Sequence, residues 1–333
     1  EYAELEGLFA RRGAEELREE LEFLRGAFAR EKTPRKPWDI AYASREDKIF
    51  NIIIHIIIAL LLVIIAYPLI FVVSSSFSSK EAVTNGRVFL LPVDFSLEGY
   101  EAVFKKNDVI IGYRNTFIYT IIGTSINLFL TMIAAYPLSR RDLPFGKGLT
   151  LLFTFTMIFS GGMIPTYMLV KSVGLINKPA VMVLVGSISA YNLIIARTFI
   201  QNNIPLELLE ASRIDGCSDF LYFAKIVLPL SKSVIAVLTL YYAITHWNSY
   251  FNAFIYLNNR KYWPLQLYLR EILLENQIDA SQIADPDLQE AKQGMANLLK
   301  YSLIVVSTIP VMLLYPFIQK HFVTGVMIGS VKG

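Results

Sequence analysis

Residues 210–229 read EASRIDGCSDFLYFAKIVLP and form a short polar island between two long apolar segments. Pro205 suits the first turn of a helix, where its missing N–H is no loss. Gly216 can take the left-handed conformation that ends a helix, and Ser218 or Asp219 can cap the next helix. The stretch therefore predicts a helix, a hinge and a second helix, after which its final proline bends the chain into a membrane. Such an element lies across a membrane surface and presents one face to a partner.

The composition is that of a membrane protein. Of the 333 residues, 54% are hydrophobic and 18% are charged, against about 25% charged residues in a soluble domain. The net charge of +3 is too small to indicate nucleic-acid binding. One cysteine and three histidines predict no internal disulfide and no structural metal site. The sequence also lacks the GxxxxGK[ST] loop that cradles ATP phosphates.

The longest apolar run covers residues 52–73, where no residue carries a formal charge and 17 of the 22 are Ile, Leu, Val or Phe. Each of these contributes about −0.3 to −0.6 kcal/mol on an insertion scale, so insertion into a bilayer is favoured. Five further runs lie near the ~20 residues that a bilayer core requires. They cover residues 115–139, 149–170, 179–196, 230–257 and 301–319. We therefore expect an all-α protein with six transmembrane helices.

The distribution of positive charge predicts the orientation of these helices. An even number of spans places both termini on the same side of the membrane. Residues 31–48 are basic, and the short loop 139–148 contains three Lys or Arg residues. By the positive-inside rule, both segments and both termini lie in the cytosol.

The chain is expected to have two parts, a cytosolic extension over residues 1–48 and a transmembrane domain over residues 49–333. Residues 1–30 show the spacing of a charged amphipathic helix, which either docks on a partner or packs against its own chain. The transmembrane domain contains a coupling loop, 203–229, and a long outer loop, 258–300.

The spacing of the opening stretch resembles the coupling motif of membrane subunits of binding-protein-dependent ABC importers. Ser212 is the one departure, because alanine is usual at that position. The residues that carry the resemblance are Glu210, Ala211, Ser212, Asp215, Gly216, Ile226, Leu228 and Pro229. Four further strings resemble the carbohydrate-uptake class, in its oligosaccharide and polysaccharide branch. They are AYPLSRRDLP ending at Pro144, FSGGMIPTY (159–167), HWNSYFNA (246–253) and GVMIGSVKG (325–333).

The resemblance implies the type I ABC importer permease fold, with coupling helices between the fourth and fifth spans. It implies two cytosolic ATPase subunits that bind ATP and Mg, an extracytoplasmic solute-binding protein, and a second permease subunit. That second subunit is another copy of this chain or, as the resemblance favours, a different chain. The chain itself would be a multi-pass protein of the bacterial inner membrane that binds no cofactor and catalyses no reaction. In the coupling motif, Glu210 would face the ATPase and Gly216 would supply the turn.

Two segments are candidates for the substrate pathway. The fifth span is rich in polar and aromatic side chains, which suit sugars and which inside a bilayer usually face water or other helices. Its candidates are Tyr241, Tyr242, Trp247, Asn248 and Tyr250; an aromatic belt at the membrane interface is the alternative. Gly161 and Gly162 interrupt the third span, either beside the pathway or for close helix packing. His246 and His55 are expected to be hydrogen-bonded structural residues.

A secondary transporter or channel that works alone is the alternative function. Such proteins usually keep ionisable groups at mid-membrane and often show internal repeats. No Asp or Glu lies in any expected span, and no repeat is evident. The outer loop 258–300 is expected to reach the binding protein, with a solvated connector as its alternative.

Overall fold

The computed structural model describes residues 45–105, 107–281 and 294–313, and in these ranges the regular elements are all helices. The chain divides into two compact units, Glu1–Tyr67 and Pro68–Gly333. The expected amphipathic helix, part of the outer loop and the tail from residue 314 lie outside the described residues.

The first long helix, α2 (Arg45–Ser76), crosses the boundary between the two units and confirms the helix expected over residues 52–73. Within it, His55 Nδ1 lies 2.7 Å from the carbonyl oxygen of Asn51. This histidine is hydrogen-bonded within its own helix, as expected.

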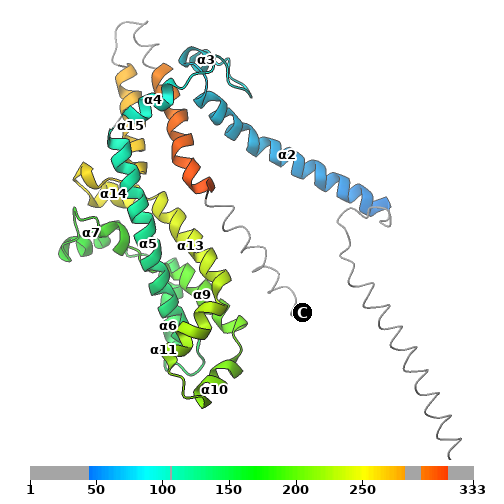
Figure 1. Ribbon diagram of the computed structural model, residues 1–333, viewed down its shortest axis with the longest axis vertical. Coiled ribbons are helices and arrows are strands. Elements are labelled where there is room, and N and C mark those ends of the chain that lie inside the picture. Colours follow the sequence, from blue (N-terminus) through cyan, green and yellow to red (C-terminus); the bar gives the residue numbers. More distant parts are fainter. Residues whose placement is uncertain (1–44, 106, 282–293, 314–333) are drawn as a thin grey trace, which may run out of the picture. The chain divides into compact units, whose positions relative to one another are not determined.

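The second unit contains the remaining described helices (Figure 1). They are α3 (Lys80–Thr84), α4 (Glu98–Lys105), α5 (Asn107–Ser139), α6 (Gly146–Ile158), α7 (Met163–Ser172), α8 (Val181–Leu184), α9 (Ala190–Asn203), α10 (Leu206–Ile214), α11 (Asp219–Tyr222), a π-helix (Phe223–Val227), α12 (Leu228–Leu230), α13 (Lys232–Trp247), α14 (Phe251–Tyr256), a 3-10 helix (Arg260–Tyr262), α15 (Leu265–Ser281) and a last helix, Gly294–Leu313.

Three described helices are long and apolar enough to cross a membrane, namely Asp47–Ser76, Asn107–Ser139 and Gly294–Leu313. Two bent pairs raise the number to five if each pair is one span. One pair is α6 with α7, bent by 115°, and the other joins Asp219–Leu230 to α13 with a bend of 80°. The span expected over residues 179–196 is divided between α8 and α9, so the count of six stays a prediction.

Helix α5 is the centre of the second unit and contacts α13, α9 and α15. Its 33 residues extend about 50 Å at 1.5 Å per residue, more than the ~30 Å of a bilayer core. The buried face of α5 repeats every three or four residues and carries small and polar side chains. It includes Gly112, Thr116, Tyr119, Gly123, Asn127, Thr131 and Ala135. Small residues let neighbouring helices approach closely, which is typical of helices packed within a membrane.

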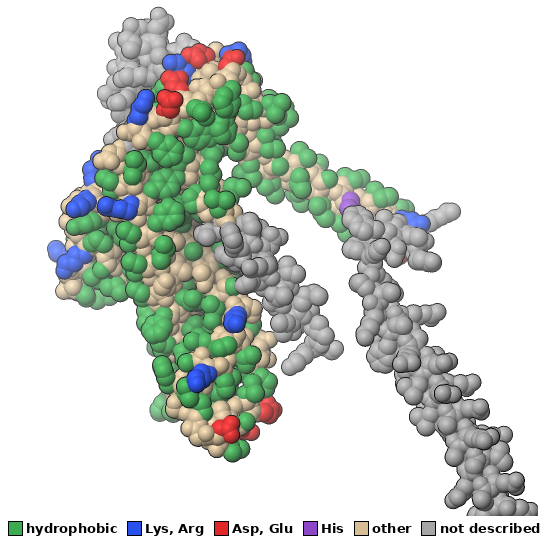
Figure 2. Space-filling view, in the orientation of Figure 1, with side chains coloured by type: hydrophobic (Ala, Val, Ile, Leu, Met, Phe, Trp, Pro, Cys, Tyr) green, Lys and Arg blue, Asp and Glu red, His purple; other side chains and the backbone are tan. Residues whose placement is uncertain are grey.

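The two ends of α5 differ in what they contact. Helices α10 and α11 lie near its C-terminal end, whereas α4 and α15 lie near its N-terminal end (Figure 1). On the face of the second unit shown in Figure 2, acidic side chains gather at these two ends, and many hydrophobic and a few basic side chains lie on the surface between them. This distribution suits a domain whose middle lies in a bilayer.

Candidate functional site

Residues 206–230, which cover most of the predicted coupling loop 203–229 and are called the coupling stretch below, form the helix, hinge and helix that the sequence predicts. Helix α10 ends at Ile214, and Gly216 has a φ of +71°, the left-handed conformation expected for it. Ser218 is the N-cap of α11, where its Oγ accepts a hydrogen bond from Leu221 N at 3.3 Å. The local chemistry of glycine and serine therefore determines this turn.

One side of the coupling stretch packs on its own chain and the other is open. Leu209, Tyr222 and Val227 are buried against α5, α9 and α13 in one apolar cluster. At the tip, by contrast, Ile214 is 87% exposed and Phe220 is 77% exposed. Two large apolar side chains beside the turn are what a partner's groove would cover.

The residues of the coupling motif divide between these two sides. Ser212 is buried, and its hydroxyl donates to the carbonyl oxygen of Leu209 at 2.8 Å. The hydroxyl group of Ser212, where alanine is usual, thus has a hydrogen-bond partner within its own helix. Ile226 and Leu228 are half-buried. The exposed members are Glu210, Ala211, Asp215, Gly216 and Pro229.

An ion-pair network fastens the coupling stretch to the end of α5. The guanidinium of Arg140 donates two hydrogen bonds to the carboxylate of Asp142, at 2.9 and 2.6 Å, and a third to Asp219 Oδ1 at 2.5 Å. Arg213 Nη2 of α10 lies 3.0 Å from Asp142 Oδ2, so both α10 and α11 join the network. Arg140 also donates to the Tyr136 hydroxyl at 3.1 Å.

The charges in this network perturb one another. Hydrogen bonding to Asp142 raises the pKa of Arg140 further above its ordinary value. The Arg140 guanidinium in turn holds the pKa of Asp142 well below its usual range, although partial burial opposes this shift. Arg140 and Asp142 are therefore ionised at neutral pH. The sequence predicted only that the loop after α5 is basic, and it gave no sign of partners 71 to 79 residues away.

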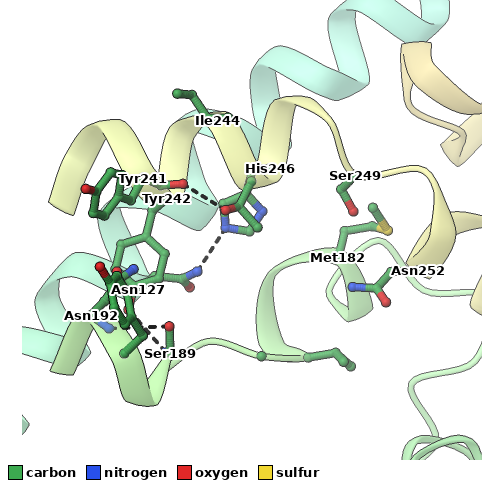
Figure 3. A pocket seen from close by; sticks show the side chains of 14 residues that line it. Asn127, Met182, Ser189, Asn192, Tyr241, Tyr242, Ile244, His246, Ser249 and Asn252 are labelled. Carbon is green, nitrogen blue, oxygen red and sulfur yellow. Dashed lines mark hydrogen bonds between the residues drawn. The ribbon is translucent and has the colours of Figure 1, made fainter. Parts of the chain in front are cut away.

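A cavity of about 470 Å³ lies between α5, α8, α9 and α13. Its lining is made mostly of hydroxyl, amide and aromatic side chains, and among the described residues no Lys, Arg, Asp or Glu contributes to it. Residues that line it include Asn127, Met182, Ser189, Asn192, Tyr241, Tyr242, His246, Ser249 and Asn252 (Figure 3). Groups of this kind form hydrogen bonds with sugar hydroxyls and stack on sugar rings.

Hydrogen bonds hold the polar wall of this cavity in place. His246 is 7% exposed, and its Nε2 lies 2.9 Å from Asn127 Nδ2 on α5. The hydrogen bond expected for His246 is confirmed, and its structural role stays a prediction. The Tyr242 hydroxyl lies 2.6 Å from Thr131 Oγ1 and accepts a hydrogen bond from Ser189 N at 3.2 Å. α13 is thereby joined to both α5 and α9.

The other pathway candidates lie in different surroundings. Trp247 is 3% exposed and donates its indole N–H to the carbonyl oxygen of Ser307 at 3.0 Å, so it packs between helices. Asn248 and Tyr250 lie in the break between α13 and α14 and are exposed. Gly161 and Gly162 lie at the 115° bend between α6 and α7 and are also exposed. The interruption expected there is confirmed, whereas the pathway role of these residues stays a prediction.

Sequence reasoning did not identify Asn127, Ser189 or Asn192 as cavity residues. Asn127 lies in a span without charged residues, and an amide side chain there is a signal of a functional or buried polar position. Ser189 is the N-cap of α9, with Asn192 N donating to its Oγ. The capping pattern was therefore present inside the segment expected to be one continuous span.

The beginning of the outer loop is fastened to the N-terminal half of α5. Asn115 Nδ2 donates to the carbonyl oxygens of Lys261 and Trp263, at 2.8 and 2.9 Å. Arg260 makes two hydrogen bonds to Glu271, at 2.8 and 2.6 Å, and one to Asp108 at 3.1 Å. This segment is therefore a firm attachment between α15 and α5.

These features define an all-helical, multi-pass membrane protein with an exposed helical hinge at one end and a polar cavity between its helices. The family of binding-protein-dependent transport system inner membrane components matches residues 109–328 of the sequence. The chain belongs to this family, so it is an ABC importer permease.

Known relatives and a solved structure agree with this family. The polygalacturonan/rhamnogalacturonan transport system permease protein YtcP of Bacillus subtilis (strain 168) is 42% identical over 86% of this chain and 100% of YtcP. The melibiose/raffinose/stachyose import permease protein MelC of the same strain is 27% identical over 83% of this chain and 96% of MelC. The crystal structure of a bacterial ABC transporter involved in the import of the acidic polysaccharide alginate aligns with a TM-score of 0.75 at 33% identity. The alignment covers 84% of this chain and 99% of that one.

Proposed function

We propose that this chain is the permease subunit of an ATP-driven importer for an oligosaccharide or polysaccharide, and that it forms part of the translocation pathway. The observation that carries the proposal is the coupling stretch. It exposes Ile214 and Phe220 beside the turn, and Arg140 joins that turn to the end of α5. A push on the tip is therefore transmitted to the helix that lines the polar cavity.

The partners follow from the family and complete the mechanism. Two cytosolic ATPase subunits bind ATP and Mg and close around the coupling stretch, with Glu210 facing a basic surface of the ATPase. A solute-binding protein delivers the saccharide on the opposite side of the bacterial inner membrane, and a second permease, a different chain, completes the pathway. The termini of this chain lie in the cytosol. Closure of the ATPases rocks the attached helices, so that the cavity opens alternately to each side.

The nature of the cavity supports a carbohydrate as the substrate. Amide, hydroxyl and aromatic groups line it, as sugars require, and no Asp or Glu of the described part of the chain lies in the lining to pass a proton. The names of the relatives agree: YtcP is a permease for polygalacturonan and rhamnogalacturonan, and the aligned solved transporter imports alginate.

ATP hydrolysis by the complete complex tests the proposal. The complex is purified with its ATPases and second permease, and hydrolysis is measured with and without the loaded binding protein. We expect stimulation in the wild type and its loss in Glu210→Lys, which reverses the charge facing the ATPase. Glu101→Lys, an exposed change near the other end of α5, is the matched control and should keep the stimulation. Full stimulation of Glu210→Lys would contradict the proposed role of the coupling stretch.

A further inference from the structure

A second cavity, of about 340 Å³, lies between the break at residues 248–250, α15 and the last helix. Its lining combines one cation with amide, hydroxyl and apolar groups. The residues are Tyr250, Gln266, Leu269, Arg270, Leu273, Leu303, Ile304 and Ser307. The same break contributes Ser249 to the first cavity and Tyr250 to this one, so the two cavities adjoin a common segment.

Arg270 lies over two exposed aromatic rings. Its Cζ lies 4.8 Å from the ring centroid of Phe254 and 5.4 Å from that of Tyr250. Both rings are more than 40% exposed. A guanidinium stacked on aromatic faces keeps its N–H edge free to donate to a carboxylate.

The electrostatic surroundings of Arg270 differ from those of Arg260, the nearby arginine of the same segment. Arg260 is neutralised by Asp108 and Glu271. Among the residues that the structure describes, no carboxylate lies within 4.0 Å of the Arg270 guanidinium, and no side chain or carbonyl accepts a hydrogen bond from it. The charge of Arg270 is thus available to a ligand.

Amide groups extend this cation-bearing surface. Gln266 Nε2 lies 3.4 Å from Asn248 Oδ1, and both side chains border the break from which Tyr250 projects. A sugar ring carrying a carboxylate presents an apolar face, hydroxyl groups and one negative charge. The rings of Tyr250 and Phe254, the two amides and Arg270 match these three features.

We propose that this cavity is a subsite for an acidic sugar unit, with Arg270 binding the carboxylate of a uronate residue. The proposal rests on the proposed import of saccharides and adds the chemical class of the substrate. Since no described Lys, Arg, Asp or Glu lines the first cavity, Arg270 distinguishes acidic from neutral saccharides, and the first cavity accepts the hydroxyl groups of either kind.

Ligand binding to the purified complex, without its binding protein, tests this subsite directly. The probes are a short oligogalacturonate and its methyl ester, which differ only in the charge of the carboxyl groups. We expect the wild-type complex to bind the acid about tenfold more tightly than the ester, and Arg270→Gln to remove that difference. Arg270→Lys should keep part of it, because lysine retains the charge but not the planar fork. Lys261→Gln, which removes an exposed charge from the same segment outside this cavity, should behave as the wild type.

Two outcomes would overturn the subsite. One is an unchanged preference for the acid in Arg270→Gln, and the other is a wild-type complex that binds acid and ester equally. If anionic lipid binds at Arg270 and oligogalacturonate does not, Arg270 binds a lipid phosphate and the proposed subsite is wrong. Uptake of a neutral oligosaccharide by the wild-type complex separates this proposal from the proposed function. If only the subsite is wrong, that uptake persists; if the proposed function is wrong, no saccharide is taken up.

Discussion

Gly216 shows how a single backbone conformation governs the coupling stretch. Its φ of +71° is available to glycine at little cost, and nothing lies within 4 Å of the position where a Cβ would be. A substitution there is therefore limited by backbone strain and not by space. A β-branched side chain in this conformation carries strain of roughly 1 to 3 kcal/mol.

We predict that Gly216→Val abolishes uptake and weakens retention of the ATPase subunits, while the yield of protein in the membrane stays normal. The reason is that the change distorts the turn without removing apolar surface from the spans. Gly216→Asn is the matched control, because asparagine tolerates a positive φ, and it should keep most of the activity. Co-purification of the ATPases measures the effect, and full retention in Gly216→Val would refute the importance of the turn.

At Gly123, by contrast, a larger side chain is limited by the space around it. A Cβ on this residue would lie 2.5 Å from both Cε1 and Nε2 of His246, a buried ring held by Asn127. We predict that Gly123→Ala displaces the imidazole and destabilises the fold by about 1–3 kcal/mol, as overpacking does. Gly161→Ala, with nothing within 4 Å, should be tolerated. Thermal unfolding of the two purified variants tests this contrast, and equal midpoints would contradict it.

At the scale of elements, the Arg140 network joins three segments that the sequence separates. Arg140 and Asp142 follow α5, Arg213 is in the last turn of α10, and Asp219 begins α11. Exposed ion pairs contribute little to stability one by one. A network around a largely buried guanidinium instead fixes orientation, so we assign Arg140 a positioning role between α5 and both coupling helices.

We predict that Arg140→Gln lowers the ATPase stimulation by binding protein several-fold and leaves basal hydrolysis unchanged. Arg141→Gln, an exposed neighbour outside the ion pairs, is the control.

The response of the Arg140 network to pH follows from Asp142. Its pKa is depressed in the folded protein, so its contribution is present above the ordinary Asp value of about 4 and is lost only at more acidic pH. We therefore expect the network to stay intact between pH 8 and pH 5. Loss of the binding-protein stimulation of ATP hydrolysis over this range in the wild type, but not in Arg140→Gln, would contradict this assignment.

Local signals predicted some elements well. Gly216 and Ser218 predicted the hinge, and Ser160 to Gly162 predicted the break between α6 and α7. Both predictions were possible because glycine and capping residues determine the backbone conformation of the residues next to them. The division of the expected span 179–196 was missed. Gly186, with a φ of +76°, and the N-cap Ser189 were the available signals, but the apolar residues around them outweighed these in a hydropathy window.

Long-range features could not be predicted in the same way. In the string HWNSYFNA, no periodicity shows that Trp247 packs toward Ser307 while Tyr250 stays exposed. That difference arises from the break after α13 and from the position of the last helix, 60 residues away. The partners of Arg140 and the polar wall around Asn127 likewise depend on which helices meet in space.

At the scale of the whole molecule, the second unit connects two distant surfaces through one helix. The outer segment is attached to α5 through Asn115 and Arg260, and the coupling stretch is attached to its other end through Arg140. The polar cavity lies against the middle of the same helix. An ATPase at one end and a binding protein at the other would thus act on the cavity between them.

ATP-dependent uptake into proteoliposomes tests this account most directly. The complete complex is reconstituted with its binding protein and a radiolabelled oligosaccharide, and this chain is also reconstituted alone. We predict uptake only when ATP, both ATPases and the binding protein are present, and none by this chain by itself. Uptake of the saccharide by this chain alone, without ATP, would contradict the account and would indicate a secondary transporter or a channel.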